Sequence, residues 1–373
     1  MPNEAGTLGD LRDGIAAAAA RPLEDATTMP PGAYTSDAVL DRECAEIFEK
    51  EWICLGRVEE VAKVGDYFTT HLGGEQLIVV RATACDIRVL SNVCRHRWTQ
   101  LASGSGHTRS FVCPYHAWTY DLDGRLVWTR FMEGQRCFDK DAHRLPQVRS
   151  EVWRGFIYAN LDEEAAPLAP RLVALDALID GYHMEEMSLI FGDDEVWANN
   201  WKLLVENFTE AYHSFQTHKH TINAFAPSEL SEIPPGGEGY SLMISPIDPK
   251  LPPRAPHHPE LPDGQRYHIT MICVFPSHVI ALAPERVFYM CLTPEGTGRV
   301  RTKWGVAGYG PTPAREAVEN LEALYREVNE EDRVRLESIQ KNLGSRFAGT
   351  GPISHLEKPN WDFTRYLARR LSP

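Results

Sequence analysis

The pattern of hydrophobic and polar positions changes twice along the chain. Residues 1–36 are rich in Ala, Pro and small polar side chains, and they predict an N-terminal arm. Residues 37–52 carry apolar side chains at helical intervals, which predicts a helix. From about residue 56 to 161, short runs of β-branched and aromatic residues are separated by Gly and Asp, and this texture predicts a small all-β domain. Such runs lie at 67–70, 76–80, 87–90 and 126–128.

Beyond a Pro-containing connection near residues 165–170, helical and strand-like patterns are mixed. The segments predicted there are a helix at 200–215, long loops at 224–266, antiparallel strands within 268–292 and 300–308, and helices at 313–343. This order predicts an α+β domain in which helices flank an antiparallel sheet. The predicted division is therefore an arm at 1–36, a β domain with its leading helix at 37–165, and an α+β domain at 166–373.

Charge and composition narrow the classes of partner. The net charge of −14 argues against nucleic acid or an anionic membrane surface as a partner. No apolar run reaches the roughly 18–20 residues of a membrane span, and no basic start precedes an apolar segment, so we expect a cytoplasmic location. The eight cysteines therefore predict reduced thiols or metal ligands rather than a disulfide framework.

The most informative motif pairs cysteine with histidine twice. Cys94 and His96 are separated by one residue, and Cys113 and His116 follow after a gap of sixteen residues, with two residues between them. Four thiolate and imidazole ligands at two short spacings predict one metal centre held by two loops.

Two kinds of centre take this ligand set. Zinc binds two Cys and two His in a tetrahedron, whereas a Rieske [2Fe–2S] cluster places Cys on one iron and His on the other. Each loop here supplies one Cys and one His, so each loop spans both irons of a cluster, and the β-rich setting has no zinc-finger helix. We therefore expect Cys94, His96, Cys113 and His116 to bind a [2Fe–2S] cluster, with a zinc-binding interaction protein as the alternative.

A second constellation begins in the helix predicted at 200–215 and extends to His218. His213 and His218 are five residues apart, which separates them by about 140° on an ideal helix. They can share a metal only if the helix ends or distorts near His213. From spacing alone, two ordinary histidines at a helix end and a metal pair are equally favoured.

The residues around both constellations resemble the Rieske oxygenases that hydroxylate aromatic rings and related substrates. The resemblance rests on residues 92–97 and 113–120 around the four cluster ligands, and on the segment from Asn200-Trp201-Lys202 to Tyr212-His213 and His218. Residues 328–343 resemble the C-terminal part of the branch that oxidises carnitine, choline and glycine betaine. One residue departs from the family pattern: Trp98 stands where the family usually has Gly.

The resemblance implies particular roles for the residues of the second constellation. His213, His218 and Asp332 would form a facial triad for Fe(II), with Glu331 as the fallback for the carboxylate. Glu210 would bridge electron transfer by hydrogen-bonding a cluster histidine of a neighbouring subunit. Asn207 would be a further residue of the catalytic site, and Glu206 would lie near it.

The resemblance also implies the activity and its partners. The chain would be the oxygenase component of a system in which a separate reductase, with or without a ferredoxin, carries flavin and takes electrons from NAD(P)H. It would be a homotrimer that hydroxylates, demethylates or cleaves a small polar substrate, with a quaternary amine or betaine favoured and an aromatic acid as the alternative. An alternative of another class is a non-enzymatic Rieske electron carrier with a ligand-binding domain.

Overall fold

The computed structural model describes residues 6–248, 250–252, 255–311 and 313–372; the first five residues of the predicted arm lie outside these ranges. Contacts between Cα atoms divide the chain into two compact units. One unit is Phe48–Leu168, and the other contains the chain up to Ile47 and again from Ala169. The predicted division at 36 and 165 stays a prediction.

The unit Phe48–Leu168 is built from strands, as its alternating pattern predicts. Its larger sheet has the order β1-β10-β9-β4-β3-β2-β5, and a smaller sheet has the order β6-β7-β8. The bounds are β1 Ile53–Arg57, β2 Asp66–Leu72, β3 Glu75–Arg81, β4 Ile87–Ser91, β5 Ser105–His107, β6 Phe111–Val112, β7 Thr119–Tyr120, β8 Leu126–Trp128, β9 Gln147–Trp153 and β10 Phe156–Asn160. The prediction of an all-β domain is confirmed.

The two cysteines of the first motif lie in the hydrophobic core of this unit. Cys94 and Cys113 are buried with Trp118, Tyr120 and Phe111. Burial of these side chains fixes the two ligand loops, because each loop is attached to the core at its own cysteine and at the apolar residues that follow it.

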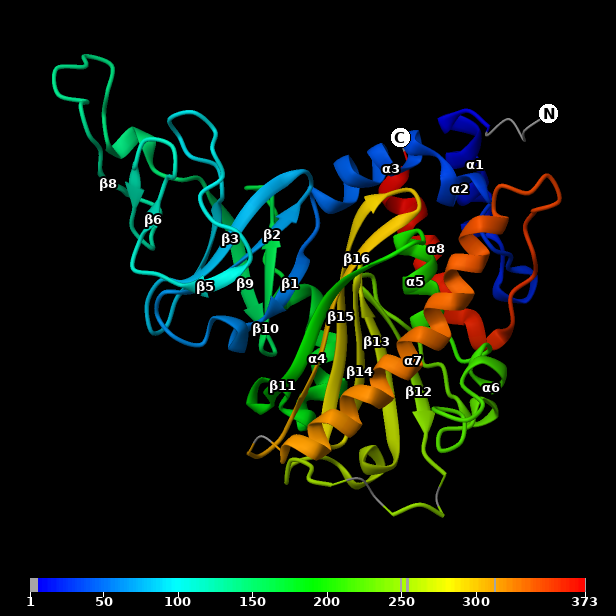
Figure 1. Cartoon of the computed structure of the whole chain (residues 1–373). Helices are drawn as coiled ribbons and strands as arrows, with labels where there is room; N and C mark the ends of the chain where they lie inside the picture. Colours follow the sequence, from blue (N-terminus) through cyan, green and yellow to red (C-terminus); the bar gives the residue numbers. More distant parts are fainter. Residues whose placement is uncertain (1–5, 249, 253–254, 312, 373) are drawn as a thin grey trace. The chain divides into compact units, whose positions relative to one another are not determined.

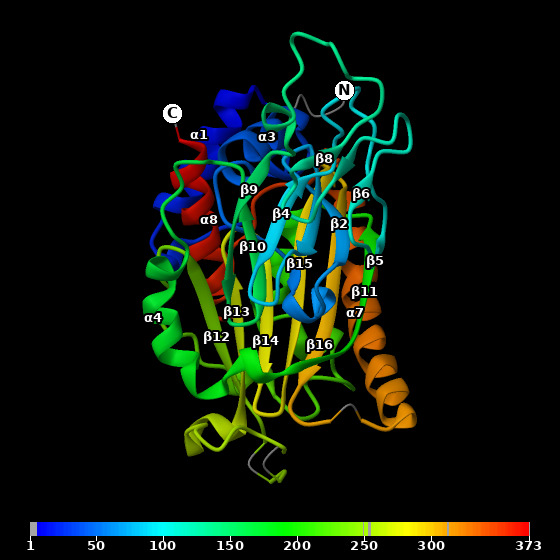
Figure 2. The same ribbon diagram turned by 90° about the vertical axis from the view of Figure 1, so that its left-hand side faces the viewer.

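The second unit contains one antiparallel sheet of order β11-β16-β15-β14-β13-β12, with helix α7 running across it (Figures 1 and 2). The strands are β11 Ser188–Trp197, β12 Tyr240–Pro246, β13 His268–Val274, β14 His278–Ala283, β15 Arg286–Gly296 and β16 Arg299–Gly308. Met243, Met271, Ala281 and Phe288 pair across four neighbouring strands and form one row of side chains. That row becomes the floor of the pocket described below.

Helices flank this sheet, which confirms the predicted α+β class. Their bounds are α1 Leu8–Ala20, α2 Gly32–Thr35, α3 Asp37–Glu43, α4 Ala169–Ile179, α5 Trp201–Phe208, α6 Ser214–Thr217, α7 Arg315–Asn342 and α8 Lys358–Leu371. A π-helical turn follows α3 at Cys44–Phe48. Short 3₁₀ turns lie at Leu23–Asp25, Val58–Val61, Asp141–His143, Asp180–Tyr182, Met184–Glu186, Ser228–Leu230, Asp263–Tyr267 and His355–Glu357.

Two local predictions were wrong. The helix predicted at 200–215 ends at Phe208 and gives way to a short break before α6. The loops predicted at 224–266 contain strand β12 at the edge of the sheet. The arm at 1–36 stays a prediction; it contains α1, whose Thr7 cap and buried Leu11 and Ile15 were not recognised in its Ala-rich composition.

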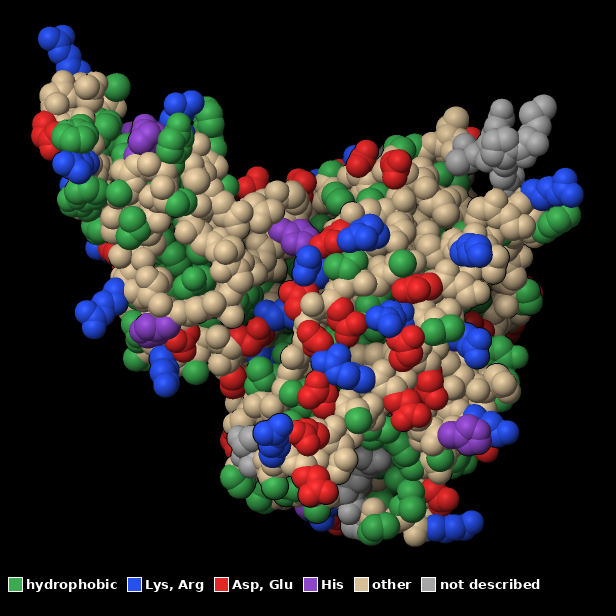
Figure 3. Space-filling view, viewed as in Figure 1, with side chains coloured by type: hydrophobic (Ala, Val, Ile, Leu, Met, Phe, Trp, Pro, Cys, Tyr) green, Lys and Arg blue, Asp and Glu red, His purple; other side chains and the backbone are tan. Residues whose placement is uncertain are grey.

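The outer surface over α7 is strongly charged. Arg326 pairs with Glu322 and Asp193, and Arg333 pairs with Glu330, and Figure 3 shows acidic and basic side chains mixed across this face. Within the described ranges, no helix is long and apolar enough to cross a membrane.

Candidate metal centres

The two loops of the first motif have the same backbone conformation. The carbonyl of Cys94 accepts from the N–H of Trp98 at 3.0 Å, and the carbonyl of Cys113 accepts from the N–H of Ala117 at 2.9 Å. The N–H of each cysteine then donates across its loop, to Thr99 in the first and to Trp118 in the second. This repeat places Cys94 and Cys113 at matching positions, and each loop adds one histidine, so the two loops together supply the two cysteines and two histidines of a two-iron cluster.

The side chains of the two loops converge. The rings of His96 and His116 lie 4.6 Å apart between centroids, and His96 stacks on the buried Trp118. The Tyr120 hydroxyl lies 3.5 Å from the Sγ of Cys94 and accepts from the N–H of Arg95. Burial raises the pKa of Cys94, and neighbouring Cys113 raises it further, so two thiolates side by side require a cation.

The donor set fits a Rieske cluster. Within the described residues, the Nδ1 atom of His96 is buried and has no hydrogen-bond partner. A buried imidazole nitrogen without a partner is costly unless a metal uses its lone pair. The predicted residues Cys94, His96, Cys113 and His116 are thus brought together with two cysteines inside and two histidines toward the surface.

The same backbone repeat shows why Gly is usual at the position of Trp98. Trp98 has φ +57° and Ala117 has φ +58°, both in the left-handed region that a Cβ atom disfavours. Gly is the residue best suited to this conformation. Trp98 therefore adopts a strained backbone while its side chain is 79% exposed and buries little apolar surface.

Replacing Trp98 with Gly is expected to stabilise the cluster-binding unit by about 1 kcal/mol, because the left-handed penalty disappears. Unfolding of the cluster-loaded protein in denaturant would measure the change. Trp98→Ala is the matched control, since Ala keeps the Cβ atom and should give little of this gain. Equal effects of the two substitutions would contradict the backbone explanation.

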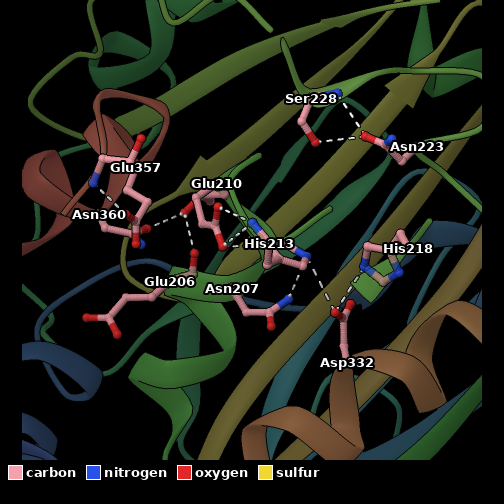
Figure 4. A network of polar contacts seen from close by, with 12 residues as sticks. Glu206, Asn207, Glu210, His213, His218, Asn223, Ser228, Asp332, Glu357 and Asn360 are labelled. Atoms are coloured by element: carbon pink, nitrogen blue, oxygen red, sulfur yellow. Dashed lines mark hydrogen bonds and ion pairs between the residues drawn. The ribbon is translucent and has the colours of Figure 1, made fainter. Parts of the chain in front are cut away.

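The second centre depends on the break between α5 and α6. Helix α5 ends at Phe208, and His213 and His218 flank the single turn of α6. The break lets both histidines face Asp332 of α7, as Figure 4 shows. The Oδ1 atom of Asp332 lies 3.0 Å from the Nε2 of His218 and 3.5 Å from the Nε2 of His213.

Each histidine is oriented by a carboxylate at its other nitrogen. The Nδ1 of His213 lies 2.5 Å from Glu210, and the Nδ1 of His218 lies 2.7 Å from Glu331. Glu331 also accepts from the Thr221 hydroxyl at 2.7 Å. A carboxylate at Nδ1 holds the proton there and turns the Nε2 lone pair toward a metal. Glu331, the alternative carboxylate, thus contacts the Nδ1 of His218 and does not lie where the two Nε2 atoms and Asp332 converge.

The polarity of the site agrees with this geometry. Burial lowers the pKa of His213, but the hydrogen bond and charge of Glu210 outweigh it and leave the pKa raised. Burial raises the pKa of Asp332, but the two neighbouring histidines together lower it by more. The net pKa of Asp332 is therefore below its usual value. Within the described part of the chain, the buried Oδ1 of Asp332 has no partner with hydrogen-bond geometry. Two imidazoles and one carboxylate that converge on one point fit Fe(II).

The remaining predicted residues lie around this triad. The Nδ2 of Asn207 is 3.5 Å from the Nε2 of His213, and Asn207 lines the pocket beside it. Glu210 also accepts from the backbone N–H of His213. Glu206 instead bonds the Tyr34 hydroxyl at 2.8 Å, away from the triad, and burial raises its pKa to about 7.

Helix α5 is fixed at its start by a buried ion pair. Asn200 caps the helix by accepting from the N–H of Lys202 at 3.0 Å. The Nζ of Lys202 lies 2.6 Å from one oxygen of Glu43, and the indole N–H of Trp201 donates to the other at 2.8 Å. Both members of the ion pair are almost wholly buried. The Asn-Trp-Lys segment therefore anchors the helix that leads to His213 and does not itself reach the triad.

A pocket of about 170 Å³ opens beside the triad. Its lining is mostly apolar, and its side chains come from alternating positions of β12 to β15 and from the facing side of α7. The rings of Phe288 and Tyr325 stack at 4.9 Å, and Phe208 lies 6.1 Å from Phe288. The sequence carried no signal for these wall residues, because apolar strand positions lining a pocket look the same as apolar strand positions in a core.

The sequence and fold of both units match known proteins. Residues 51–139 match the Rieske [2Fe-2S] domain, and residues 174–373 match the ring hydroxylating alpha subunit (catalytic domain). The glycine betaine monooxygenase oxygenase subunit of Chromohalobacter salexigens is 32% identical over 58% of this chain and 49% of that protein. The carnitine monooxygenase oxygenase subunit of Escherichia coli is 34% identical over 52% of this chain and 53% of that protein.

A solved structure agrees over a longer span. The quaternary ammonium Rieske monooxygenase CntA superposes with a TM-score of 0.83 at 25% identity, over 96% of this chain and 98% of that one. The alignments to the two oxygenase subunits, in contrast, span about half the length of those curated relatives.

The chain thus joins a Rieske [2Fe-2S] domain to the catalytic domain of a ring hydroxylating alpha subunit. The chain belongs to the ring hydroxylating alpha subunit family, and its similarity to oxygenase subunits for glycine betaine and carnitine agrees with the branch predicted from residues 328–343. The predicted cofactors, a [2Fe–2S] cluster and a mononuclear iron, are those of the two matched domains.

Proposed function

We propose that this chain is a terminal oxygenase that uses O2 and electrons from a partner NAD(P)H reductase to oxidise a small betaine-like substrate. The supporting observation is the convergence of His213, His218 and Asp332 at a mostly apolar pocket. Three ligands on one side of a metal leave positions for O2 and for substrate. Iron held there would supply the activation of O2.

The side chains around the iron have separate tasks. Glu210 and Glu331 keep the protons of both histidines on Nδ1 and so fix the two Nε2 donors. The apolar walls exclude water from the bound substrate. The rings of Phe208, Phe288 and Tyr325 line the pocket, and a trimethylammonium group binds aromatic surfaces by cation–π attraction.

Electron delivery completes the proposal. Cys94, His96, Cys113 and His116 would hold the cluster, and Glu210 would connect the cluster of one subunit to the iron site of the next within a homotrimer. The reductase, with or without a ferredoxin, would carry the flavin and meet the oxygenase in the cytoplasm, where NAD(P)H is available.

An aromatic acid is the second candidate substrate, and the stacked rings of Phe288 and Tyr325 in the pocket wall favour it.

O2 uptake with a surrogate reductase tests the proposal. We expect 4-(trimethylammonio)butanoate or glycine betaine to raise uptake, with benzoate as the aromatic comparison. Iron content should be about three atoms per chain, two in the cluster and one in the triad. His213→Ala should lower it to about two while the cluster's EPR signal persists. A chain that holds about two irons before substitution and shows no substrate-dependent uptake would be an electron carrier.

A further inference from the structure

A single cationic side chain lines the pocket. Among the described lining residues, Arg286 is the one Lys or Arg, and its surroundings are chiefly Met, Ile, Ala and Phe side chains. A guanidinium placed in a mostly apolar cavity costs desolvation free energy unless it has a charged partner or a charged ligand. Glu285 is such a partner, so the open question is what the edge of the guanidinium that Glu285 does not use can bind.

The direction of α7 shows at which end of the pocket Arg286 lies. Arg326 of α7 bonds Asp193, and Arg333, further along the helix, pairs with Glu195, so α7 and β11 advance together. Trp304 of β16 pairs with Asp193 of β11 on one side and with Met290 of β15 on the other, both antiparallel, so β11 and β15 run in the same direction. Helix α7 therefore also runs in the direction of β15. Asp332 thus lies toward the C-terminal end of β15, and Arg286, the first residue of that strand, lies toward the opposite end.

The space between the metal ligands and Arg286 suits an elongated molecule. Tyr325 lies two helical turns, about 10 Å, before Asp332 and stacks on Phe288. Arg286 lies two residues before Phe288 on the same face of β15, at a spacing of about 7 Å. On the neighbouring strand, Ala281 and Ala283 stand opposite Phe288 and Arg286 and leave room above the sheet.

Glu285 holds the guanidinium in a defined orientation. One oxygen of Glu285 accepts from both the Nε of Arg286 at 2.9 Å and the Nη2 at 2.8 Å. A guanidinium has five N–H donors in a planar fork, so this pairing uses one edge only. The outer edge of such a fork matches the two oxygens of a carboxylate.

We propose that Arg286 is a specificity-determining residue that binds the carboxylate of the substrate at the end of the pocket away from the metal ligands. The inference rests on the proposed oxygenase function and adds the substrate class: an acid whose oxidised carbon lies near His213, His218 and Asp332 and whose carboxylate reaches Arg286. The aromatic rings between the two ends contact the middle of the molecule. Betaines with a longer carbon chain fit this arrangement better than glycine betaine.

Arg286→Gln tests the proposal with a matched pair of ligands, 4-(trimethylammonio)butanoate and its carboxamide. For the acid we expect KM and the calorimetric Kd without O2 to rise about 10- to 100-fold, because a charge-assisted hydrogen bond is lost. The kcat should change less than about threefold, since the contact is equal in ground and transition states. Arg286→Lys should restore part of the acid's affinity.

The carboxamide separates this role from a structural one. Its affinity should be weak in the parent protein and nearly unchanged by Arg286→Gln, whereas general damage to the pocket would weaken both ligands. Arg315→Gln, at a side chain that is 92% exposed on α7, is the control and should alter neither ligand. If the parent protein bound the acid and the carboxamide equally, the role of Arg286 would be overturned, but substrate-dependent O2 uptake would still support the oxygenase function. If no substrate raised O2 uptake, the oxygenase function itself would be overturned.

Discussion

Asp332→Ala is expected to remove the mononuclear iron and lower substrate-dependent O2 consumption by more than about 100-fold. Loss of a residue that only orients a metal ligand costs about 10–100-fold in metal affinity or activity, and loss of a ligand itself should cost more. The buried Oδ1 of Asp332 lies within 3.5 Å of both Nε2 atoms, so Ala leaves two imidazoles without the anionic donor. Metal analysis and O2 uptake would measure both effects.

Glu331→Gln provides the graded comparison for this substitution. The Gln side chain keeps the size of Glu331 but loses the charge that fixes the Nδ1 proton of His218. We expect a loss of about 10–100-fold in iron affinity, with the EPR signal of the cluster unchanged in both variants. If Glu331→Gln removed the iron and Asp332→Ala retained it, the assignment of the ligand would have to be exchanged between these neighbouring carboxylates.

The proposed cluster site could be predicted from the sequence because its candidate ligands come from two short loops. Cys94 and His96 lie on one loop and Cys113 and His116 on the other, so local spacing already defines most of the geometry. The structure adds the matching left-handed residues at Trp98 and Ala117, which spacing alone does not contain. The strands of this unit were predictable for a similar reason, since alternation and Gly-rich turns are local signals.

The iron site was less accessible because it depends on distant segments. A helix continued without a break through residue 218 would keep His213 and His218 about 140° apart, and the end of α5 at Phe208 allows them to come together. Asp332 is 114 residues beyond His218 and reaches it through the packing of α7 on the sheet. The choice between Glu331 and Asp332 depends on which face of α7 looks inward, and adjacent residues on a helix face different ways.

The most severe loss of folding stability is expected from Glu43→Ala. This substitution leaves the ammonium of Lys202 buried without its carboxylate and removes the acceptor of the Trp201 indole. Breaking a buried ion pair by removing one partner costs about 3–5 kcal/mol. Unfolding of the second unit in denaturant should show this decrease in the free energy of unfolding.

The double variant Glu43→Leu with Lys202→Met separates the charge from the fold. Replacing both charges by apolar side chains of similar size removes the uncompensated ammonium, so most of the lost stability should return. Helix α5 would then keep its Asn200 cap and its apolar contacts, and iron binding at His213 should persist. If the double variant were as unstable as Glu43→Ala, the ion pair itself would be required to hold α5, and the iron site would depend on α3 as directly as on its own ligands. Because Glu43 precedes the ligand histidines by more than 160 residues, such a result would extend the functional site to the N-terminal helices.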